Sequence, residues 1–236
     1  MDNELTSLNK SINGGVKTSL AQKVSNRITE ALINKELRPG DRLPPVEELT
    51  RSLGVGKSSV REAIKMFEAL GVVESKQGEG TFICKHPVEN SINPLIIQLI
   101  LEQGGEKDII SLRSMFEPAY TLMAMQVATD EDKRKIEETI FKLEEKIKTN
   151  SQTADDDMNF HLMILKSTHN PYVIRIGETI MQLFRASLKK SMVRIPNVAL
   201  NDHKSLFTAF CNNDSEGIMK AIMISFESWS VSLHET

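Results

Sequence analysis

The stretch VGKSSVREAIKMFEALGVVESKQGEGTF, residues 55–82, combines two hydrophobic patterns with different periods. In its first half, basic residues recur at Lys57, Arg61 and Lys65, and apolar residues form a stripe on the opposite face of the same predicted helix. β-branched residues and a glycine-rich turn then predict a two-stranded hairpin. A basic helix followed by a glycine-tipped hairpin is the geometry of a module that places one element in a DNA groove and another on the flanking backbone.

The residues before this stretch predict two further helices. Apolar residues at helical spacing predict a helix over 19–36, and a Pro-Pro pair predicts a short helix over 46–53, because proline is tolerated in a first turn. Ser59 and Glu62 have the spacing of a capping box, which places the start of the basic helix within 56–59. Helix, turn, helix and hairpin together predict a winged helix-turn-helix domain.

Composition indicates an ordinary globular protein of two domains. The chain has 236 residues, of which 40% are hydrophobic and 26% are charged. The longest apolar run, near 94–101, is too short for a membrane span, and residues 1–15 are too polar for a signal peptide, so we expect a cytoplasmic protein without membrane contact. Cys84 and Cys211 lie far apart and lack CxxC spacing, which argues against a disulfide framework and a thiolate zinc site.

Charge is distributed unevenly between the two parts of the chain. Residues 16–85 contain 12 Lys and Arg against 9 Asp and Glu, whereas residues 86–236 contain 16 against 21. A basic first part joined to an acidic remainder indicates that the first part meets a polyanion. The excess is small, and a run of charge is more often a solvated face.

The fold class expected from these patterns is mainly α. The expected parts are a mobile tail (1–15), a winged helix-turn-helix domain (16–85), a linker (86–93) and an all-α antiparallel helical bundle (94–236). The helices expected in the bundle are 94–102, 108–128, 130–149, 155–168, 172–192, 200–212 and 215–233. Short polar connections between helices of this length predict antiparallel neighbours.

The run RPGDRLPPVEELTRSLGVGKSSVREAIKMFEALGVVESKQGEGTF, residues 38–82, resembles the DNA-binding domain of GntR-type bacterial transcription regulators. The PGDRLP, VREA and GxGTF motifs carry the resemblance at the family's spacing. It implies that the recognition helix and the wing tip contact double-stranded DNA. The residues implied at these contacts are Lys57, Ser58, Ser59, Arg61, Gln77 and Gly78.

Two positions depart from the family pattern. Lys57 stands where the family usually has arginine, so the bidentate fork onto a guanine or phosphate is lost. Glu47 stands where a basic residue is common, and its carboxylate is expected to face away from phosphate or to contact a base amino group. Arg51, four residues later, either supplies a phosphate contact or pairs with Glu47, and the sequence leaves both readings open.

A carboxylate and an imidazole in the second part of the chain have the spacing of a metal-binding pair. Asp157 and His161 are four residues apart and project from one face of their predicted helix, and His203 belongs to a later helix. The pair alone is more often a hydrogen bond on a helix surface than a metal site.

The second part of the chain also resembles the FCD ligand-binding domain of FadR-type GntR regulators. LRSMFEP, DMNFHLMILKSTHN and DHKSLFTAFCNND carry this resemblance. In many such domains one Asp and three His hold a divalent metal, of the zinc or nickel class, that helps to bind a small carboxylate. Three of the four positions correspond to Asp157, His161 and His203, but the fourth falls on Ser225, a much poorer ligand. Arg113 either binds an organic acid directly or forms a salt bridge with its neighbour one turn away.

The resemblance implies a homodimeric regulator that reads a palindromic operator. A small carboxylate metabolite bound in the helical domain would change its DNA affinity, and repression relieved by the ligand is the expected outcome. The alternative is a metal-dependent hydrolase that uses Asp157, His161 and His203, with the winged helix as a protein-binding module. The sequence offers no general base or nucleophile beside this cluster, so we expect a protein that is not an enzyme. A third reading, a winged helix that binds only proteins, predicts no salt-dependent DNA affinity.

Overall fold

The computed structural model describes residues 19–86, 88, 93–102 and 104–234. The chain divides into two compact units, Met1–Pro94 and Leu95–Thr236. The predicted tail 1–15 lies outside the described residues, as do 87 and 89–92 of the predicted linker.

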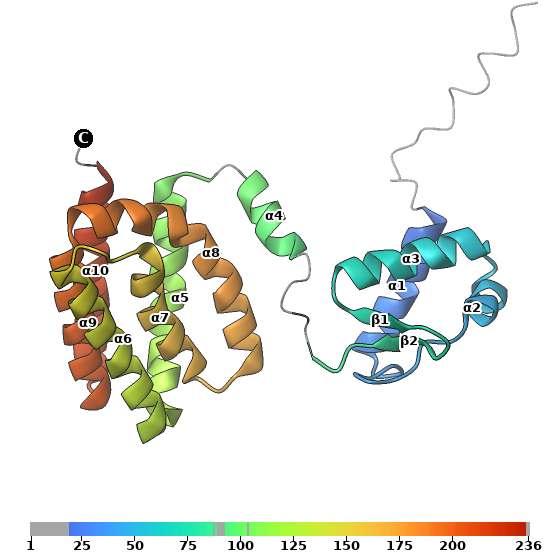
Figure 1. The fold of residues 1–236 in the computed structure, drawn as a ribbon, viewed down its shortest axis with the longest axis horizontal. Coiled ribbons are helices and arrows are strands. Elements are labelled where there is room, and N and C mark those ends of the chain that lie inside the picture. Colours follow the sequence, from blue (N-terminus) through green and yellow to red (C-terminus); the bar gives the residue numbers. More distant parts are fainter. Residues whose placement is uncertain (1–18, 87, 89–92, 103, 235–236) are drawn as a thin grey trace, which may run out of the picture. The chain divides into compact units, whose positions relative to one another are not determined.

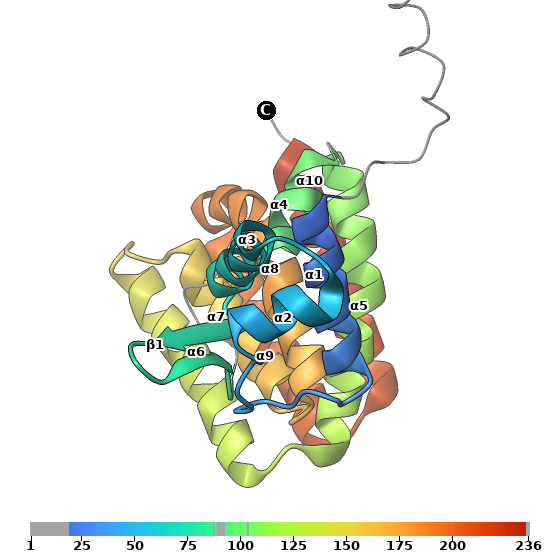
Figure 2. The ribbon, with the colours of Figure 1, turned by 90° about the vertical axis from the view of Figure 1, so that its right-hand side faces the viewer.

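The first unit has the winged helix-turn-helix arrangement that the sequence predicts (Figure 1). Its helix α3 contacts α1, α2 and β1, and an antiparallel hairpin follows it (Figure 2). The elements are α1 (Leu20–Ile33), α2 (Val46–Leu53), α3 (Lys57–Ala69), β1 (Val73–Lys76) and β2 (Gly80–Ile83).

The core of this unit is built from the apolar stripes of α1 and α3. Val24 and Val60 are fully buried, and Phe67 lies against the same cluster. The helices form because their apolar residues recur every three or four positions, and packing these faces together removes them from water. The buried stripe leaves the basic side of α3 exposed.

The segment between α1 and α2 adds a third strand-like edge to the hairpin. Leu43 donates its backbone N–H to the carbonyl of Thr81 at 2.8 Å, and Ile83 donates to Asp41 at 2.8 Å. Arg42 faces Phe82 in an isolated antiparallel bridge. The PGDRLP motif therefore fixes the wing to the helical core by backbone hydrogen bonds.

Two predicted features of this unit were wrong: the end of α1 and the capping box of α3. Helix α1 ends at Ile33 rather than 36, because Lys35 takes a left-handed φ of 61° and the chain turns back there. The capping box predicted at Ser59 is not formed, because Gly56 is the N-cap of α3 and Ser59 lies inside the first turn. Glycine at this position supplies no side-chain cap.

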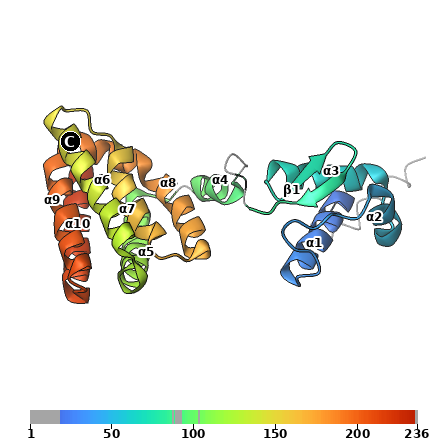
Figure 3. The ribbon, with the colours of Figure 1, turned by 60° about the horizontal axis from the view of Figure 1, so that its bottom comes forward.

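The second unit consists of helices, and several of them lie lengthwise beside one another (Figures 1 and 3). They are α4 (Pro94–Leu101), α5 (Glu106–Val127), α6 (Asp130–Lys148), α7 (Ala154–Lys166), α8 (Pro171–Arg194), α9 (Pro196–Cys211) and α10 (Ser215–His234). The mainly α fold class is therefore confirmed. None of the described helices is long and apolar enough to cross a membrane.

Large apolar side chains from several of these helices form one core. Phe160 of α7, Phe210 of α9 and Ile136 of α6 are fully buried in it. Helix α9 begins at Pro196, four residues before the predicted start at 200, because a proline at the first helical position needs no N–H partner. Inside this core, α5, α7, α8, α9 and α10 enclose a group of charged side chains.

Candidate functional site

The first half of α3 presents polar side chains to solvent. Lys57, Ser58 and Arg61 are exposed, whereas Ser59 is half-buried. Because the buried stripe of α3 occupies the opposite face, these side chains are free to meet a partner in a groove.

Lys57 already has a charged partner within the unit. Its Nζ lies 3.0 Å from Oε1 of Glu47 on α2. The hydrogen bond from Lys57 lowers the pKa of Glu47, and the charges of Lys57 and Arg61 act in the same direction. Glu47 pairs with Lys57 rather than with Arg51, which is exposed on α2; of the two readings of Arg51, the salt bridge is therefore not the one observed.

The wing tip is shaped by glycines. Gln77 and Gly78 are exposed, and Gly78 has a φ of 77° with open space where a Cβ would stand. Gly80 has a φ of 113°, and a Cβ there would lie 2.8 Å from Nε of Arg42. The left-handed backbone angle favours glycine at this position, and a Cβ there would also displace the Arg42 guanidinium.

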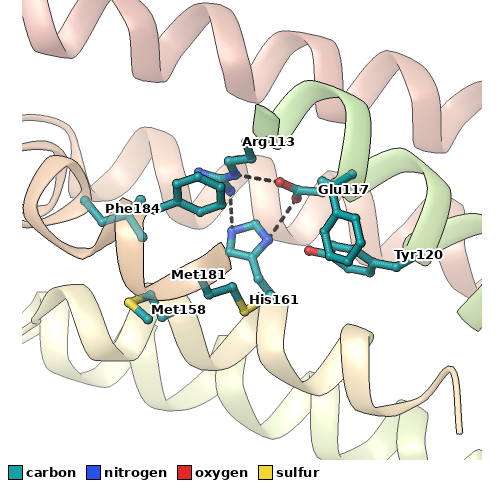
Figure 4. Close-up of a pocket in the computed structure, with 9 residues that line it drawn as sticks. Arg113, Glu117, Tyr120, Met158, His161, Met181 and Phe184 are labelled. Carbon is teal, nitrogen blue, oxygen red and sulfur yellow. Dashed lines mark hydrogen bonds and ion pairs between the residues drawn. The ribbon is translucent and has the colours of Figure 1, made fainter. Parts of the chain in front are cut away.

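A buried cluster of charged side chains lies between α5 and α7 in the second unit (Figure 4). Arg113 donates from Nε to Glu117 Oε2 at 2.6 Å and from Nη2 to His161 Nε2 at 2.8 Å. Nδ1 of His161 lies 2.9 Å from the other oxygen of Glu117. Since a guanidinium only donates, Nε2 of His161 accepts, and the proton of the neutral ring is on Nδ1, facing Glu117.

Burial and charge act in opposite directions on this cluster. Burial opposes the charged form of Arg113, but Glu117 and Asp157 outweigh it and raise its pKa. Burial likewise opposes ionisation of Glu117, but Arg113 and His161 outweigh it and hold the pKa of Glu117 far below its usual range. The guanidinium also lies near three aromatic rings, with Cζ 4.9 Å from the ring centroid of Trp229. The other two rings are Phe184 at 5.8 Å and Phe226 at 5.5 Å.

Asp157 joins this cluster to His203 on α9. Asp157 Oδ1 lies 3.3 Å from His203 Nε2, and Asp157 Oδ2 lies 3.8 Å from His161 Nε2. Burial opposes ionisation of Asp157, but His203, His161 and Arg113 outweigh it and lower its pKa. Burial lowers the pKa of His203, which favours the neutral ring. The structure therefore brings the predicted residues Asp157, His161, His203 and Arg113 into one buried group.

Ser225, the remaining predicted residue, lines the same cavity from α10. Asp202 of α9 lines it too, and burial together with the charge of Asp157 raises the pKa of Asp202 to about 6. All five residues predicted for the effector site thus face one region of the second unit.

Comparison with known proteins identifies both units. Residues 20–83 match the bacterial regulatory proteins of the gntR family, and residues 108–227 match the FCD domain. The chain belongs to the GntR family. Its FCD domain is the unit that holds the buried charged cluster.

Several curated relatives of this GntR protein are named as operon regulators. The putative L-lactate dehydrogenase operon regulatory protein of Escherichia coli (strain K12) is 28% identical over 215 residues, covering 86% of this chain and 82% of the relative. The galactonate operon transcriptional repressor of the same organism is 24% identical over 212 residues, covering 86% and 92%. A solved structure, Streptococcus agalactiae GntR, shares the fold with a TM-score of 0.62 at 21% identity, covering 91% of this chain and all of that one.

These matches decide between the functional classes. GntR-family proteins with an FCD domain are transcription regulators that bind DNA through the first domain and a small molecule through the second. The chain is therefore a transcription regulator and not an enzyme, and the alternative of a metal-dependent hydrolase is not supported.

The donor set in the FCD domain fits a divalent cation. Asp157, His161 and His203 each offer a ligand atom within 4.8 Å of the others, and Asp157 Oδ2 is buried without a hydrogen-bond partner. Glu117 lies 2.9 Å from Nδ1 of His161, on the side of the ring away from this group, where a carboxylate commonly stands behind a metal-ligating histidine. Arg113 donates to the same lone pair, so a metal would have to displace it from Nε2.

Sequence reasoning missed several residues of this GntR site. The spacing of Arg113 and Glu117 indicated a salt bridge, which the structure has, but gave no sign that Glu117 also contacts His161. Asp202 carries a detectable signal, an acidic residue directly before a predicted histidine ligand. The aromatic rings around Arg113 lie on helices distant in sequence, so no local pattern in the sequence indicated that they would contact it.

Proposed function

We propose that this GntR-family protein is a repressor that binds a palindromic operator as a homodimer and is released from it by a small organic acid. The observation that carries the proposal is the buried Arg113, a guanidinium 5% exposed inside the FCD domain and lining a cavity. A buried cation beside a cavity is suited to an anionic ligand, because the carboxylate forms charge-assisted hydrogen bonds there that it lacks elsewhere.

The charge of the cluster supports a metal at the same site. With both histidines neutral, Arg113, Glu117 and Asp157 leave one net negative charge in a buried region. Asp157, His161 and His203 would hold a divalent ion, which when bound supplies a Lewis acid that attracts a carboxylate oxygen. Ser225 at the fourth position lowers the expected affinity for the ion.

The DNA side of the proposal rests on the exposed basic end of α3. Arg61 can form two hydrogen bonds with a guanine or a phosphate, Lys57 can reach a phosphate once it leaves Glu47, and the hydroxyls of Ser58 and Ser59 can add weaker contacts. Gln77 and Gly78 at the wing tip and Arg51 on α2 are proposed to contact the flanking backbone. A dimer of winged helices matches a two-fold operator.

Replacing Arg61 by Ala tests this interface. We first select an operator from a random DNA pool with the wild-type protein. Arg61→Ala is expected to lose about 5- to 150-fold in operator affinity, because each good bidentate contact contributes about 1–3 kcal/mol. Circular dichroism checks that the fold is unchanged. The matched control is Arg134→Ala, an exposed arginine on α6, which should bind as the wild type does. Unchanged affinity of Arg61→Ala would remove α3 from the interface.

A further inference from the structure

Two small chambers adjoin the Arg113–His161 hydrogen bond in the FCD domain. We name them by their linings. The apolar chamber is lined by Phe116, Tyr120, Met158, Met181, Phe184 and Leu188, together with the charged triad of Arg113, Glu117 and His161. The polar chamber shares Arg113, His161 and Leu188 with it, and its polar lining residues are Asp157, Ser191, Asp202, His203, Ser225 and Ser228.

The two chambers differ in what they offer a ligand. The polar chamber offers carboxylates, imidazole and hydroxyls from α7, α8, α9 and α10. In the apolar chamber, the hydroxyl of Tyr120 is the one polar side-chain group among the described lining residues outside the triad. Figure 4 shows Met158, Met181 and Phe184 gathered on one side of the Arg113–His161 bond and Tyr120 beside Glu117.

Both chambers are nearly closed in this structure. Their volumes are about 10 Å³ for the apolar chamber and 20 Å³ for the polar one, room for a water molecule or little more. The hydrogen bond between Arg113 Nη2 and His161 Nε2 forms part of the wall that the two chambers share. A ligand carboxylate that accepts the hydrogen bond from Nη2 would break the bond between Arg113 and His161 and so open this wall. The thioethers of Met158 and Met181 are unbranched and flexible, so they can move aside for an apolar group.

Resting on the proposed function, we infer that the effector is a 2-hydroxy monocarboxylic acid with a hydrocarbon tail. Its carboxylate binds Arg113, its 2-hydroxyl faces the hydroxyls and carboxylates of the polar chamber, and its tail enters the apolar chamber. Arg113 is already paired with Glu117, so the ligand carboxylate would take the Nη2 hydrogen bond, whereas a second carboxylate at the tail would lie near the negative charge of Glu117 and be repelled.

A sugar acid fits this arrangement poorly. A sugar acid has the same carboxylate and 2-hydroxyl as the proposed effector. Its remaining hydroxyls, however, would enter the apolar chamber, where among the described lining residues the Tyr120 hydroxyl is the one hydrogen-bonding partner besides Arg113, Glu117 and His161. Each hydroxyl buried without a partner weakens binding on the order of tenfold. The apolar chamber therefore selects by the polarity of the tail.

Matched pairs of acids test this inference with the full-length protein. The pairs are lactate with glycerate, 2-hydroxybutanoate with threonate, and 2-hydroxyhexanoate with galactonate. Members of a pair share chain length, carboxylate and 2-hydroxyl, and differ in the polarity of the tail. Differential scanning calorimetry measures the rise in Tm with each acid, in EDTA and again with Ni²⁺. The hydrocarbon member of the longer pairs is expected to bind at least tenfold more tightly than its partner.

A methionine variant locates the tail. Met181→Ala removes the side-chain atoms beyond Cβ from the apolar chamber, so the preferred acid should become longer by about two carbons. Met192→Ala is the matched control, since Met192 is also buried on α8 but lies outside the described lining of both chambers. The control should lower Tm without changing the preferred acid.

The outcomes separate this inference from the proposed function. Tighter or equal binding of the hydroxylated members would overturn the hydrocarbon tail and leave an acid-responsive regulator intact. An unchanged preference in Met181→Ala would overturn the placement of the tail. If no acid raises Tm or releases the selected operator while the protein still binds that operator, both the inference and the proposed response to acids fail.

Discussion

Arg113 makes two hydrogen bonds that differ in how far they could be foreseen. Its bond to Glu117 joins residues one turn apart on α5, and helical spacing alone predicts it. Its bond to His161 joins residues 48 apart in the chain and depends on how α5 packs against α7. Local spacing thus predicted the Arg113–Glu117 pair and the family resemblance supplied the other candidates for the site, whereas the packing of helices decided which of them meet.

Removing the charge of Glu117 is expected to destabilise the FCD domain. Glu117→Gln leaves the Arg113 guanidinium buried with a weaker partner, and breaking a buried pair in this way costs about 3 kcal/mol or more. Urea unfolding at pH 7 measures the change in the free energy of unfolding. The control is Glu138→Gln on α6, whose exposed pair with Lys142 at 3.8 Å should contribute less than about 0.5 kcal/mol. A loss in Glu117→Gln as small as in the control would contradict a buried ion pair.

Ser225 lines the cavity at the position where the family resemblance implies a histidine ligand. Ser225→His is expected to raise the affinity for Ni²⁺ by about tenfold or more, because an imidazole adds a fourth protein ligand where the serine hydroxyl is a poor one. Isothermal titration calorimetry measures this affinity. Ser228→His, on the same helix and in the same cavity lining, is the matched control. Equal gains in both variants would place the ion elsewhere.

At the scale of elements, the sequence predicted which helices and strands exist better than it predicted the end of α1 and the start of α9. Stripes of apolar residues predicted α1 and α3, because the period of a buried face is a property of the element itself. Helix α3 begins at Lys57, inside the predicted range 56–59, but the capping box expected from the spacing of Ser59 and Glu62 is not formed, because Gly56 is the N-cap. Helix ends depend on backbone angles such as that of Lys35, which composition does not reveal.

Helix α6 begins with a capping box whose stability contribution depends on pH. Asp132 accepts hydrogen bonds from the backbone N–H of Thr129 at 2.8 Å and from its hydroxyl at 2.6 Å, and it contacts His169 at 2.8 Å. Burial raises the pKa of Asp132, but these hydrogen bonds outweigh it and hold the pKa below its usual value. The ionised carboxylate therefore stabilises the fold above the unfolded pKa of about 3.9, and this stabilisation is lost as pH falls through the lower folded pKa.

Asp132→Asn should reveal this dependence. We expect a loss of about 1 kcal/mol in the free energy of unfolding at pH 5, because the capping box loses its charge at a helix N-terminus. The difference from wild type should shrink at pH 3 and below. Urea unfolding at each pH measures it. Asp130→Asn, an exposed residue in the same first turn, is the control and should show a smaller and flatter difference.

At the scale of the whole molecule, the division into a DNA-binding and a ligand-binding unit followed from two separate sets of motifs. The uneven charge gave little help: the basic excess of the first part is small, and the Glu47–Lys57 pair offsets part of it. What the sequence could not supply is the lining of the two chambers, because five helices contribute to it. Such a lining is determined by tertiary packing rather than by any local pattern.

The operator affinity of a homodimer that binds a palindrome should depend strongly on both half-sites. Scrambling one half of the selected operator, at constant length, is expected to weaken binding at least a hundredfold, because the second contact is then no longer intramolecular. Electrophoretic mobility shift at fixed salt measures this loss. Light scattering should give twice the chain mass of 26.5 kDa. A half-site that binds as well as the full operator would indicate a monomeric reader.

The ring beside Arg113 has a practical consequence. Trp229 is the single tryptophan of the chain, it is 3% exposed, and its ring lies 4.9 Å from the guanidinium carbon. Indole emission responds to the electric field of nearby charges, so any ligand that moves or neutralises this guanidinium should shift the fluorescence spectrum. The protein therefore contains its own optical reporter, at the site itself, and the rate at which an acid enters could be followed by stopped-flow fluorescence without attaching a dye.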